Sequence, residues 1–280
     1  MYIKNVKNID EKTVSSFGNE WNRFDQKGMS VDESKKIFNN YFSIFPWNNI
    51  TSEAEGFDMG CGCSGRWASF VAPRVGHLNC IDPSSAIDVA KKILSDCDNI
   101  TFIRGSVSDN QLQKNSQDFG YSLGVLHHVP DTQKGIKSCV ELLKVDAPLL
   151  LYLYYAFDNK PFFYKAIWKV SDIFRSVISK LPLIIRNICT DIIFVFVYIP
   201  LVYLSKVAER IGINPDNIPL SFYRNKSLYT MRTDSRDRFG TPLEKRFTRD
   251  EINEMMVESG LKDIQFFDKV PFWCVIGYKK

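Results

Sequence analysis

A glycine-rich turn that begins with an acidic residue is the part of the sequence best suited to chemistry. It reads Asp58-Met59-Gly60-Cys61-Gly62-Cys63-Ser64-Gly65-Arg66-Trp67 and lies between a strand-like run and a helix-like run. Because its glycines lack Cβ atoms, the backbone can approach a ligand closely, and the following helix presents unpaired N–H groups. Asp82 follows Gly65 by 17 positions, at the end of a second strand-like run, where a carboxylate can accept hydrogen bonds from ribose hydroxyls. This spacing predicts a site for a cofactor that contains adenosine.

The glycine pattern alone does not identify that cofactor. Gly60-x-Gly62-x-x-Gly65 matches the dinucleotide-binding fingerprint, which would indicate a dehydrogenase. Asp58, however, stands two residues before the first glycine, where its carboxylate would meet a cationic amine and repel a pyrophosphate. A dehydrogenase is therefore the weaker alternative.

Two adjacent histidines are the candidate catalytic residues. His127 and His128 follow a fourth strand-like run, at the carboxyl edge where sheets of this kind bind ligands. Either could act as a base or contact the substrate; alternatively, one of them anchors the loop through the backbone. Tyr154, at the end of a fifth strand-like run, is a candidate substrate contact or a packing residue. We expect Asp131 to cap the helix that follows it.

A basic segment, 224–249, carries eight Lys or Arg residues against three acids. Arginines near a site suit a carboxylate or phosphate group on a substrate, and Arg232 and Arg246 are the candidates. The alternative is that these arginines form salt bridges that fix the loop 239–242.

Composition limits the class of protein. The 280 residues are 45% hydrophobic and 24% charged, with a net charge of +4, as in an ordinary globular protein without a nucleic-acid-binding arm. The seven cysteines show no zinc-ligand spacing, so we expect no metal site and reduced thiols in a cytoplasmic protein. The N-terminus is too polar for a signal peptide.

The order of short apolar runs and helical patterns predicts an α/β fold. Five strand-like runs alternate with helical patterns and predict a parallel sheet covered on both faces: 55–58, 77–82, 100–105, 119–124 and 148–155, with helices near 66–75, 84–95 and 131–144. Near the C-terminus, a capping box at 248–251 opens a helix that ends at Gly260. Two strand-like runs follow, 261–268 and 272–278, and their short link requires an antiparallel pair.

The alternation of strand-like and helical runs stops at residues 157–230, where the sequence is helical throughout. We interpret this segment as a cap or lid inserted into the α/β domain of residues 1–156 and 231–280. Within it, the stretch 192–204 carries no charge. Thirteen residues are fewer than the roughly 17–25 that span a bilayer, and Pro200 is expected to interrupt them. We therefore expect no transmembrane span. A buried or interface helix is one reading, and a helix lying against a membrane or a lipid-like substrate is the other.

Three stretches together resemble the class I S-adenosylmethionine-dependent methyltransferases, of the small-molecule, ubiquinone/menaquinone-methyltransferase-like superfamily. They are FDMGCGCSGRW, CIDPSSAIDVAKK and FGYSLGVLHHVPD, with the final helix-strand-strand as a fourth point of likeness. The resemblance implies a Rossmann-like, doubly wound, seven-stranded and mostly parallel sheet whose last strand is antiparallel. It also implies S-adenosyl-L-methionine as cofactor and methyl transfer as the reaction.

The resemblance also assigns roles to individual residues. It places Asp58, Gly60 and Gly62, with Cys61 in the same turn, at the methionine part of the cofactor, although we expect the Cys61 side chain to pack. It places Asp82 at the ribose with Pro83 and Ser84 beside it, Ser106 and Val107 at the adenine, and Leu123 and Gly124 at the methionyl chain. Many relatives carry an acidic residue where this chain has Ser106, so the adenine contacts depart from the family pattern. The N-terminal stretch 17–24 resembles a leader that either folds over the cofactor or docks on the sheet as a helix.

Methyl transfer demands in-line alignment and exclusion of water more than it demands a particular catalytic residue. We expect a small-molecule acceptor with an apolar and an anionic part. An RNA or protein acceptor is one alternative, and a non-catalytic, cofactor-binding regulatory protein is another.

Overall fold

The computed structural model describes residues 8–24, 28–63 and 67–280. The chain forms two compact units: a sheet unit of residues 1–26, 34–156 and 243–280, and a helical unit of residues 27–33 and 157–242. Gly65 and Arg66, from the predicted turn and the start of the predicted helix 66–75, lie outside the described residues. A lid function for the inserted segment 157–230 stays a prediction.

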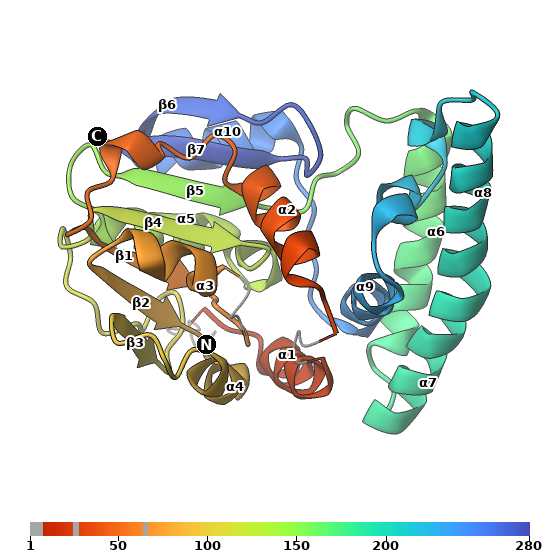
Figure 1. Cartoon of the computed structure of the whole chain (residues 1–280), viewed down its shortest axis with the longest axis horizontal. Helices are drawn as coiled ribbons and strands as arrows, with labels where there is room; N and C mark the ends of the chain where they lie inside the picture. Colours follow the sequence, from red (N-terminus) through yellow and green to blue (C-terminus); the bar gives the residue numbers. More distant parts are fainter. Residues whose placement is uncertain (1–7, 25–27, 64–66) are drawn as a thin grey trace, which may run out of the picture. The chain divides into compact units, whose positions relative to one another are not determined.

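The sheet unit contains seven strands in the order β3-β2-β1-β4-β5-β7-β6 (Figure 1). Strands β1 to β5 are parallel, and β7 runs antiparallel to both β5 and β6. The predicted doubly wound fold is confirmed. Chain order reverses between β1 and β4, so the loops after these strands diverge and leave a place for a ligand at their carboxyl ends. The strands are β1 Glu55–Met59, β2 His77–Ile81, β3 Ile100–Ile103, β4 Phe119–Leu123, β5 Pro148–Tyr152, β6 Leu261–Phe266 and β7 Cys274–Lys279.

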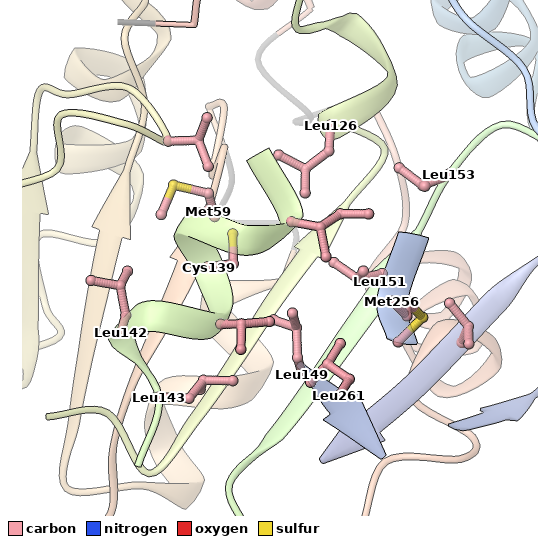
Figure 2. Close-up of a cluster of buried hydrophobic side chains, with 14 of the residues drawn as sticks. Met59, Leu126, Cys139, Leu142, Leu143, Leu149, Leu151, Leu153, Met256 and Leu261 are labelled. Carbon is pink, nitrogen blue, oxygen red and sulfur yellow. The ribbon is translucent and has the colours of Figure 1, made fainter. Parts of the chain in front are cut away.

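Helices cover both faces of this sheet. On one face, α5 and α10 close a core of buried aliphatic side chains from β1, β5 and β7, including Leu149 and Leu151 (Figure 2). On the other, rings from the segment after α2 pack on β4, with Phe42 against Tyr121 and Phe45 against Phe119. The helices are α1 Glu11–Arg23, α2 Val31–Tyr41, η1 Trp47–Asn49, α3 Ala68–Val71, η2 Ala72–Arg74, α4 Ala86–Ile93, η3 Leu126–His128, α5 Thr132–Leu142 and α10 Arg249–Glu258.

Side-chain caps explain where two of these helices begin. The Asp131 carboxylate accepts a hydrogen bond from the Lys134 N–H, so its predicted role as a cap is confirmed. Thr248 and Glu251 form the predicted capping box at the start of α10.

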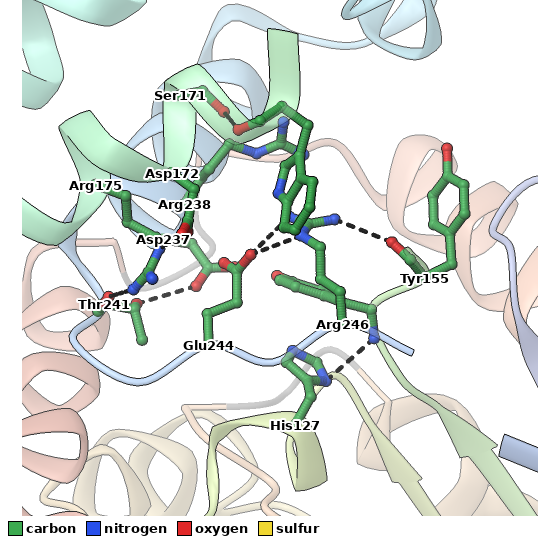
Figure 3. A network of polar contacts seen from close by, with 12 residues as sticks. His127, Tyr155, Ser171, Asp172, Arg175, Asp237, Arg238, Thr241, Glu244 and Arg246 are labelled. Carbon is green, nitrogen blue, oxygen red and sulfur yellow. Dashed lines mark hydrogen bonds and ion pairs between the residues drawn. The ribbon is translucent and has the colours of Figure 1, made fainter. Parts of the chain in front are cut away.

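The helical unit is built around α9, which packs against α6, α7 and η4. Arg175 joins α6 to the end of α9 by donating to the Thr241 carbonyl (Figure 3). It also donates to the Pro242 carbonyl. The elements are α6 Phe162–Ile178, α7 Leu183–Ile193, the π-helical turn η4 Phe194–Tyr198, α8 Ile199–Arg210, η5 Pro215–Asn217, η6 Ser221–Asn225 and α9 Leu228–Gly240.

One expectation for this segment was wrong. Pro200 does not interrupt the chain, because the π-helical turn Phe194–Tyr198 lies just before it and joins α7 to α8 without a break. A π turn shifts the backbone hydrogen-bond pattern by one residue, which makes room for a residue that has no N–H to donate. Among the described residues, one continuous helix, Leu183–Arg210, is long and apolar enough to cross a membrane by length and composition.

We predict that Leu151→Ala destabilises the sheet unit by about 2–5 kcal/mol, because it leaves a cavity in a fully buried cluster. The matched control is Val145→Ala, since Val145 is 65% exposed and its truncation creates no cavity. Chemical denaturation of both variants measures the difference. Equal losses of unfolding free energy would contradict this account of the core.

Candidate functional site

The loops after β1 and β2 are tied together at the carboxyl edge of the sheet. The N–H groups of Gly60 and Cys61 both donate to the Ile81 carbonyl, at 2.8 and 3.0 Å. The Gly62 N–H donates to Asp82 Oδ2 at 2.9 Å. The glycine turn and the acidic residue that the sequence singled out are therefore brought into direct contact.

The glycine turn needs glycine for its backbone conformation. Gly60 and Gly62 have φ of +84° and +59°, a region that costs other L-residues about 1–2 kcal/mol. A Cβ atom on Gly60 would also clash with the Val125 side chain. The turn therefore approaches the loop after β4 more closely than any side chain at this position would allow.

Asp58 is a buried carboxyl for which the described residues supply no countercharge. It is 1% exposed, and its Oδ2 has no hydrogen-bond partner among the described residues. Burial raises the pKa of Asp58 to about 8, the neighbouring charge of Asp82 raises it further, and the Tyr121 hydroxyl acts in the opposite direction. Such a carboxyl is poised to lose its proton when a cation arrives.

Asp82 has most of its acceptor capacity in use. Its Oδ1 accepts from the N–H and the hydroxyl of Ser84, at 2.8 and 2.6 Å, while Oδ2 accepts from Gly62 alone among the described residues. A carboxylate offers about four lone-pair sites, so Oδ2 can still accept one hydroxyl. Burial raises the pKa of Asp82, and the bonds from Ser84 and Gly62 oppose that rise.

Helix α1 covers these loops. The Trp21 indole lies beside Gly62, and Gly18 lies against Ser85, in the segment that follows Asp82. The Phe17 ring meets His128 edge-on at 4.9 Å between centroids. The N-terminal stretch is thus a helix docked over the glycine turn, and its aromatic residues were the sequence signal for it. A groove of about 360 Å³ between α1 and Pro83–Ser85 opens beside it.

The remaining residues assigned to the cofactor lie on the same edge. Leu123 ends β4, and Gly124 follows it with φ of +80°. Ser106 lies in the loop after β3, where its backbone pairs with that of Asp109, and Val107 packs into the core beneath. Their contacts with an adenine stay a prediction.

Both histidines are buried and held by the backbone, and His127 is drawn in Figure 3. His128 Nδ1 is 2.6 Å from the Leu243 carbonyl oxygen, and His127 Nδ1 is 3.4 Å from the Tyr154 N–H nitrogen. The Nε2 atom of each ring has no hydrogen-bond partner in the described part of the chain. Burial, followed by His128 and Arg246, lowers the pKa of His127 well below its usual value, so this ring stays neutral.

Tyr154 and Arg246 stack on this pair. The Tyr154 ring stacks on His127 with 3.8 Å between centroids and 28° between the ring planes, and the Arg246 guanidinium lies 5.1 Å from the centroid of the Tyr154 ring. Arg246 also forms an ion pair of 2.7 Å with Glu244, a residue that sequence reasoning missed although it stands two positions away (Figure 3). The positive charge that was predicted to meet a substrate anion is thus balanced inside the protein.

Arg232 is placed differently from the other candidates. It belongs to α9 of the helical unit, where its guanidinium makes two hydrogen bonds to the Asp191 carboxylate, at 2.9 and 2.8 Å. This pair joins α7 to α9, which supports the salt-bridge alternative for Arg232. A substrate contact by Arg232 stays a prediction.

Comparison with known proteins agrees with this geometry. Residues 57–151 match the model of a family described as a methyltransferase domain. This stretch contains Gly60 and Gly62 of the glycine turn, Asp58, Asp82 and both histidines. A comparison with curated proteins gave no match.

Solved structures share the fold. The YcgJ protein of Bacillus subtilis is 14% identical, with 82% of this chain and 70% of that chain covered and a TM-score of 0.51. A candidate methyltransferase of Bacillus halodurans is 12% identical, with coverages of 84% and 72% and a TM-score of 0.51. The CurJ carbon methyltransferase is 9% identical, with coverages of 93% and 58% and a TM-score of 0.53. At these identities the likeness shows the fold alone.

The described residues fit the cofactor that the resemblance implies. The buried, unpartnered Oδ2 of Asp58 suits an ammonium group, and Asp82 Oδ2 retains room for one ribose hydroxyl. The glycines between them keep side chains out of the space that backbone and ligand must share.

We predict that Gly60→Ala weakens the binding of S-adenosylmethionine at least tenfold, because the new Cβ is strained and displaces Val125. Isothermal titration measures the dissociation constant. Gly212→Ala is the matched control: Gly212 has φ of +79° but nothing within 4 Å of its Cβ position, in the helical unit. It should lose stability without losing affinity, and equal weakening by both variants would contradict the role of the turn.

We also predict a pH dependence of stability that is due to Asp58. Its pKa is about 8 in the folded protein, against an ordinary value of 3.8 for an aspartate. Between these pH values the folded state therefore binds a proton that the unfolded state has lost. The unfolding free energy therefore falls as pH rises through this window, by roughly 1 kcal/mol per pH unit from this group. Asp58→Asn removes this contribution.

Denaturation of the wild type and Asp58→Asn at pH 5, 6 and 7, without cofactor, tests this prediction. The stability of the variant relative to the wild type should improve with each step in pH. A constant difference would show that Asp58 does not titrate as its burial requires.

Proposed function

The chain carries a class I S-adenosylmethionine-dependent methyltransferase domain, and from this premise we propose that it methylates a hydroxyl group of a small, largely apolar acceptor. The cofactor, S-adenosylmethionine, supplies a methyl group bonded to a positively charged sulfur when it is bound. The acceptor oxygen must lose its proton as it is methylated. A buried group that can take this proton is therefore the feature to look for.

The orientation of His128 is the observation that carries the proposal. A carbonyl oxygen only accepts hydrogen bonds, so the contact with Leu243 requires the proton of the neutral ring to sit on Nδ1. Nε2 then carries a lone pair, and it is buried without a partner among the described residues. His128 is thus arranged as a general base, a role worth roughly 10²–10⁴-fold in rate.

His127 has the opposite arrangement. Its Nδ1 accepts from the Tyr154 N–H, so the proton of the neutral ring sits on Nε2. Its lowered pKa keeps the ring from taking a second proton. We assign it a donor role, holding an acceptor oxygen beside His128, whose ring centroid is 4.0 Å away.

A small acceptor is favoured over RNA or protein by the enclosure of these groups. Asp58, Asp82 and both histidines are all buried, and α1 lies over the glycine turn. A small molecule can be enclosed in this way, which excludes water from the reaction. An RNA or protein chain would need a site that stays open to the surface.

The rings around the histidines favour an apolar, flat acceptor. Phe17, Tyr152 and Tyr154 lie in one cluster with them, and Tyr41 meets Tyr152 edge-on at 5.0 Å. Flat groups gain about 0.5–1.5 kcal/mol from such contacts beyond the area they bury. Arg246 and Arg232 have their charges balanced by Glu244 and Asp191, so they lend no support to an anionic group on the acceptor.

A cofactor-binding regulatory protein without turnover is the second candidate. The same glycine turn and carboxylates would serve it, but it would have no use for a buried, unpartnered Nε2 on His128. Turnover decides between the two candidates.

The test is formation of S-adenosylhomocysteine with three sets of acceptors: phenolic or isoprenoid small molecules, total RNA, and unfolded protein. We expect turnover only with the small molecules. His128→Asn keeps a side-chain N–H that can reach the Leu243 carbonyl but removes Nε2, so it should lower kcat by about 10²–10⁴-fold. Its affinity for S-adenosylmethionine should stay within twofold of the wild type.

His77→Gln is the control. His77 lies at the start of β2 and its ring forms a hydrogen bond with the Thr101 hydroxyl, so its substitution should leave kcat unchanged. Equal kcat for His128→Asn and the wild type would remove His128 as the base. Turnover with RNA or protein alone would overturn the acceptor class, and binding without any turnover would favour the regulatory protein.

A further inference from the structure

The helical unit exposes apolar side chains along two of its helices. A soluble surface rarely carries a contiguous apolar patch larger than a few hundred Å², and larger patches mark interaction sites. We call these residues the apolar face. On α6 they are Phe162, Phe163, Ile167, Val170, Ile173, Phe174 and Val177; on the helix 183–210 they are Leu183, Ile184, Ile185, Ile188, Ile192, Val195, Phe196, Val197, Ile199, Tyr203 and Leu204.

On each helix these residues recur at helical spacing. On α6, positions 163, 167, 170, 174 and 177 follow a pattern of three and four. On the long helix, positions 184, 188, 192, 195 and 199 do the same. The opposite sides are the ones that pack on α9, so each helix presents a continuous apolar stripe to its surroundings.

The long stripe carries no exposed charge over about six turns. Between residues 183 and 205 the chain has only two charged residues, Arg186 and Asp191. Arg186 donates to the carbonyls of Leu181 and Gly240, and Asp191 pairs with Arg232 of α9. Both charges are therefore held within the helical unit and away from the apolar face.

Basic residues border the face. Lys169 and Lys180 are exposed on or just beyond α6, and Lys206 and Arg210 are exposed at the C-terminal end of α8. Residues 157–242 as a whole contain 13 Lys or Arg against seven Asp or Glu. The chain's net charge of +4 thus arises from this segment, because the rest of the sequence is net acidic.

We propose that the apolar face docks on an anionic lipid bilayer, with the helices lying in the plane of the membrane. Apolar side chains would enter the boundary between headgroups and acyl chains, and the bordering Lys and Arg side chains would reach the lipid phosphates. Each basic residue near an anionic surface contributes to such binding, so the charge of the unit supports a lipid partner. A second copy of the chain would bring two positively charged units together.

The charges of α9 favour docking over spanning. The helix 183–210 is long enough to cross the hydrocarbon core, at about 1.5 Å per residue. Its other side, however, packs on α9, which carries Arg232, Asp234 and Arg238. Crossing would take these charges into hydrocarbon, whereas lying in the plane leaves them in water. This inference does not rest on the acceptor proposed above.

Co-sedimentation of the full-length chain with vesicles tests the proposal. We expect binding to vesicles of equal parts phosphatidylglycerol and phosphatidylcholine, and at least tenfold weaker binding to phosphatidylcholine alone. The double variant Ile184→Asp/Phe196→Asp should lose binding at least tenfold. Both positions are about three-quarters exposed, so the changes should leave the fold intact, as circular dichroism can verify.

Two matched controls separate the apolar and charge contributions. Val145→Asp places the same charge at an exposed position of the sheet unit and should bind vesicles as the wild type does. Lys169→Glu/Lys206→Glu should reduce the preference for anionic vesicles while the apolar face stays intact.

A second measurement separates docking from spanning. The chain already contains five tryptophans, so the signal is the fluorescence that Phe196→Trp adds to that of the wild type. This added fluorescence should be quenched by lipids brominated near the headgroup more strongly than by lipids brominated near the chain end. Stronger quenching from the chain end would show a spanning helix and overturn in-plane docking. Failure to bind either vesicle, together with a dimer that Ile184→Asp/Phe196→Asp dissociates, would assign the face to a second copy instead.

Discussion

A buried carboxyl group, with no countercharge in the part of the chain that the structure describes, is the constraint on which the candidate site depends. Asp58 stands at the end of β1, where the order of the sheet reverses between β1 and β4. Water cannot stabilise its charged form there, and no described residue supplies a cation to one of its oxygens. Ionisation of Asp58 is therefore unfavourable until a ligand places a cation beside the carboxyl group. The fold thus prepares a site suited to an ammonium group.

Main-chain hydrogen-bond donors and acceptors fix where the protons lie on the neighbouring side chains. The Gly62 N–H engages one oxygen of Asp82, and the Leu243 carbonyl and the Tyr154 N–H set the tautomers of the two histidines. Each of these partners is a main-chain group whose position follows from a strand end or a tight turn. The arrangement therefore depends on the path of the chain at the sheet edge more than on further side chains.

Most of the sheet could be predicted from the sequence because each strand is a short apolar run between turn signals. The antiparallel tail followed from the short link between β6 and β7. Two features of the helical unit could not be predicted. Helix α9 is rich in charged residues and shows no apolar stripe, since it is held by ion pairs such as Arg232–Asp191. Pro200 looked like a break because the π turn before it has no sequence signature.

Of the candidate site, too, one part could be predicted from the sequence and another could not. Spacing along the chain was enough to select Asp58, Asp82 and the histidines. In the sheet unit Gly62 donates to Asp82, and the charge of Asp82 acts on Asp58. Sequence could not show which histidine has a lone pair on Nε2, because that depends on a carbonyl 115 residues away. It also could not show that Glu244 balances Arg246, since neighbouring opposite charges in a chain need not pair.

The protonation state of Asp58 is the central claim, and infrared difference spectroscopy measures it most directly. Adding S-adenosylmethionine at pH 7 should remove the C=O stretch of a protonated carboxyl group and produce carboxylate bands, because the cofactor's cation replaces the proton. The same difference spectrum of Asp58→Asn should lack both signals. A wild-type spectrum without loss of the protonated carboxyl, recorded where cofactor binding is saturated, would contradict the account.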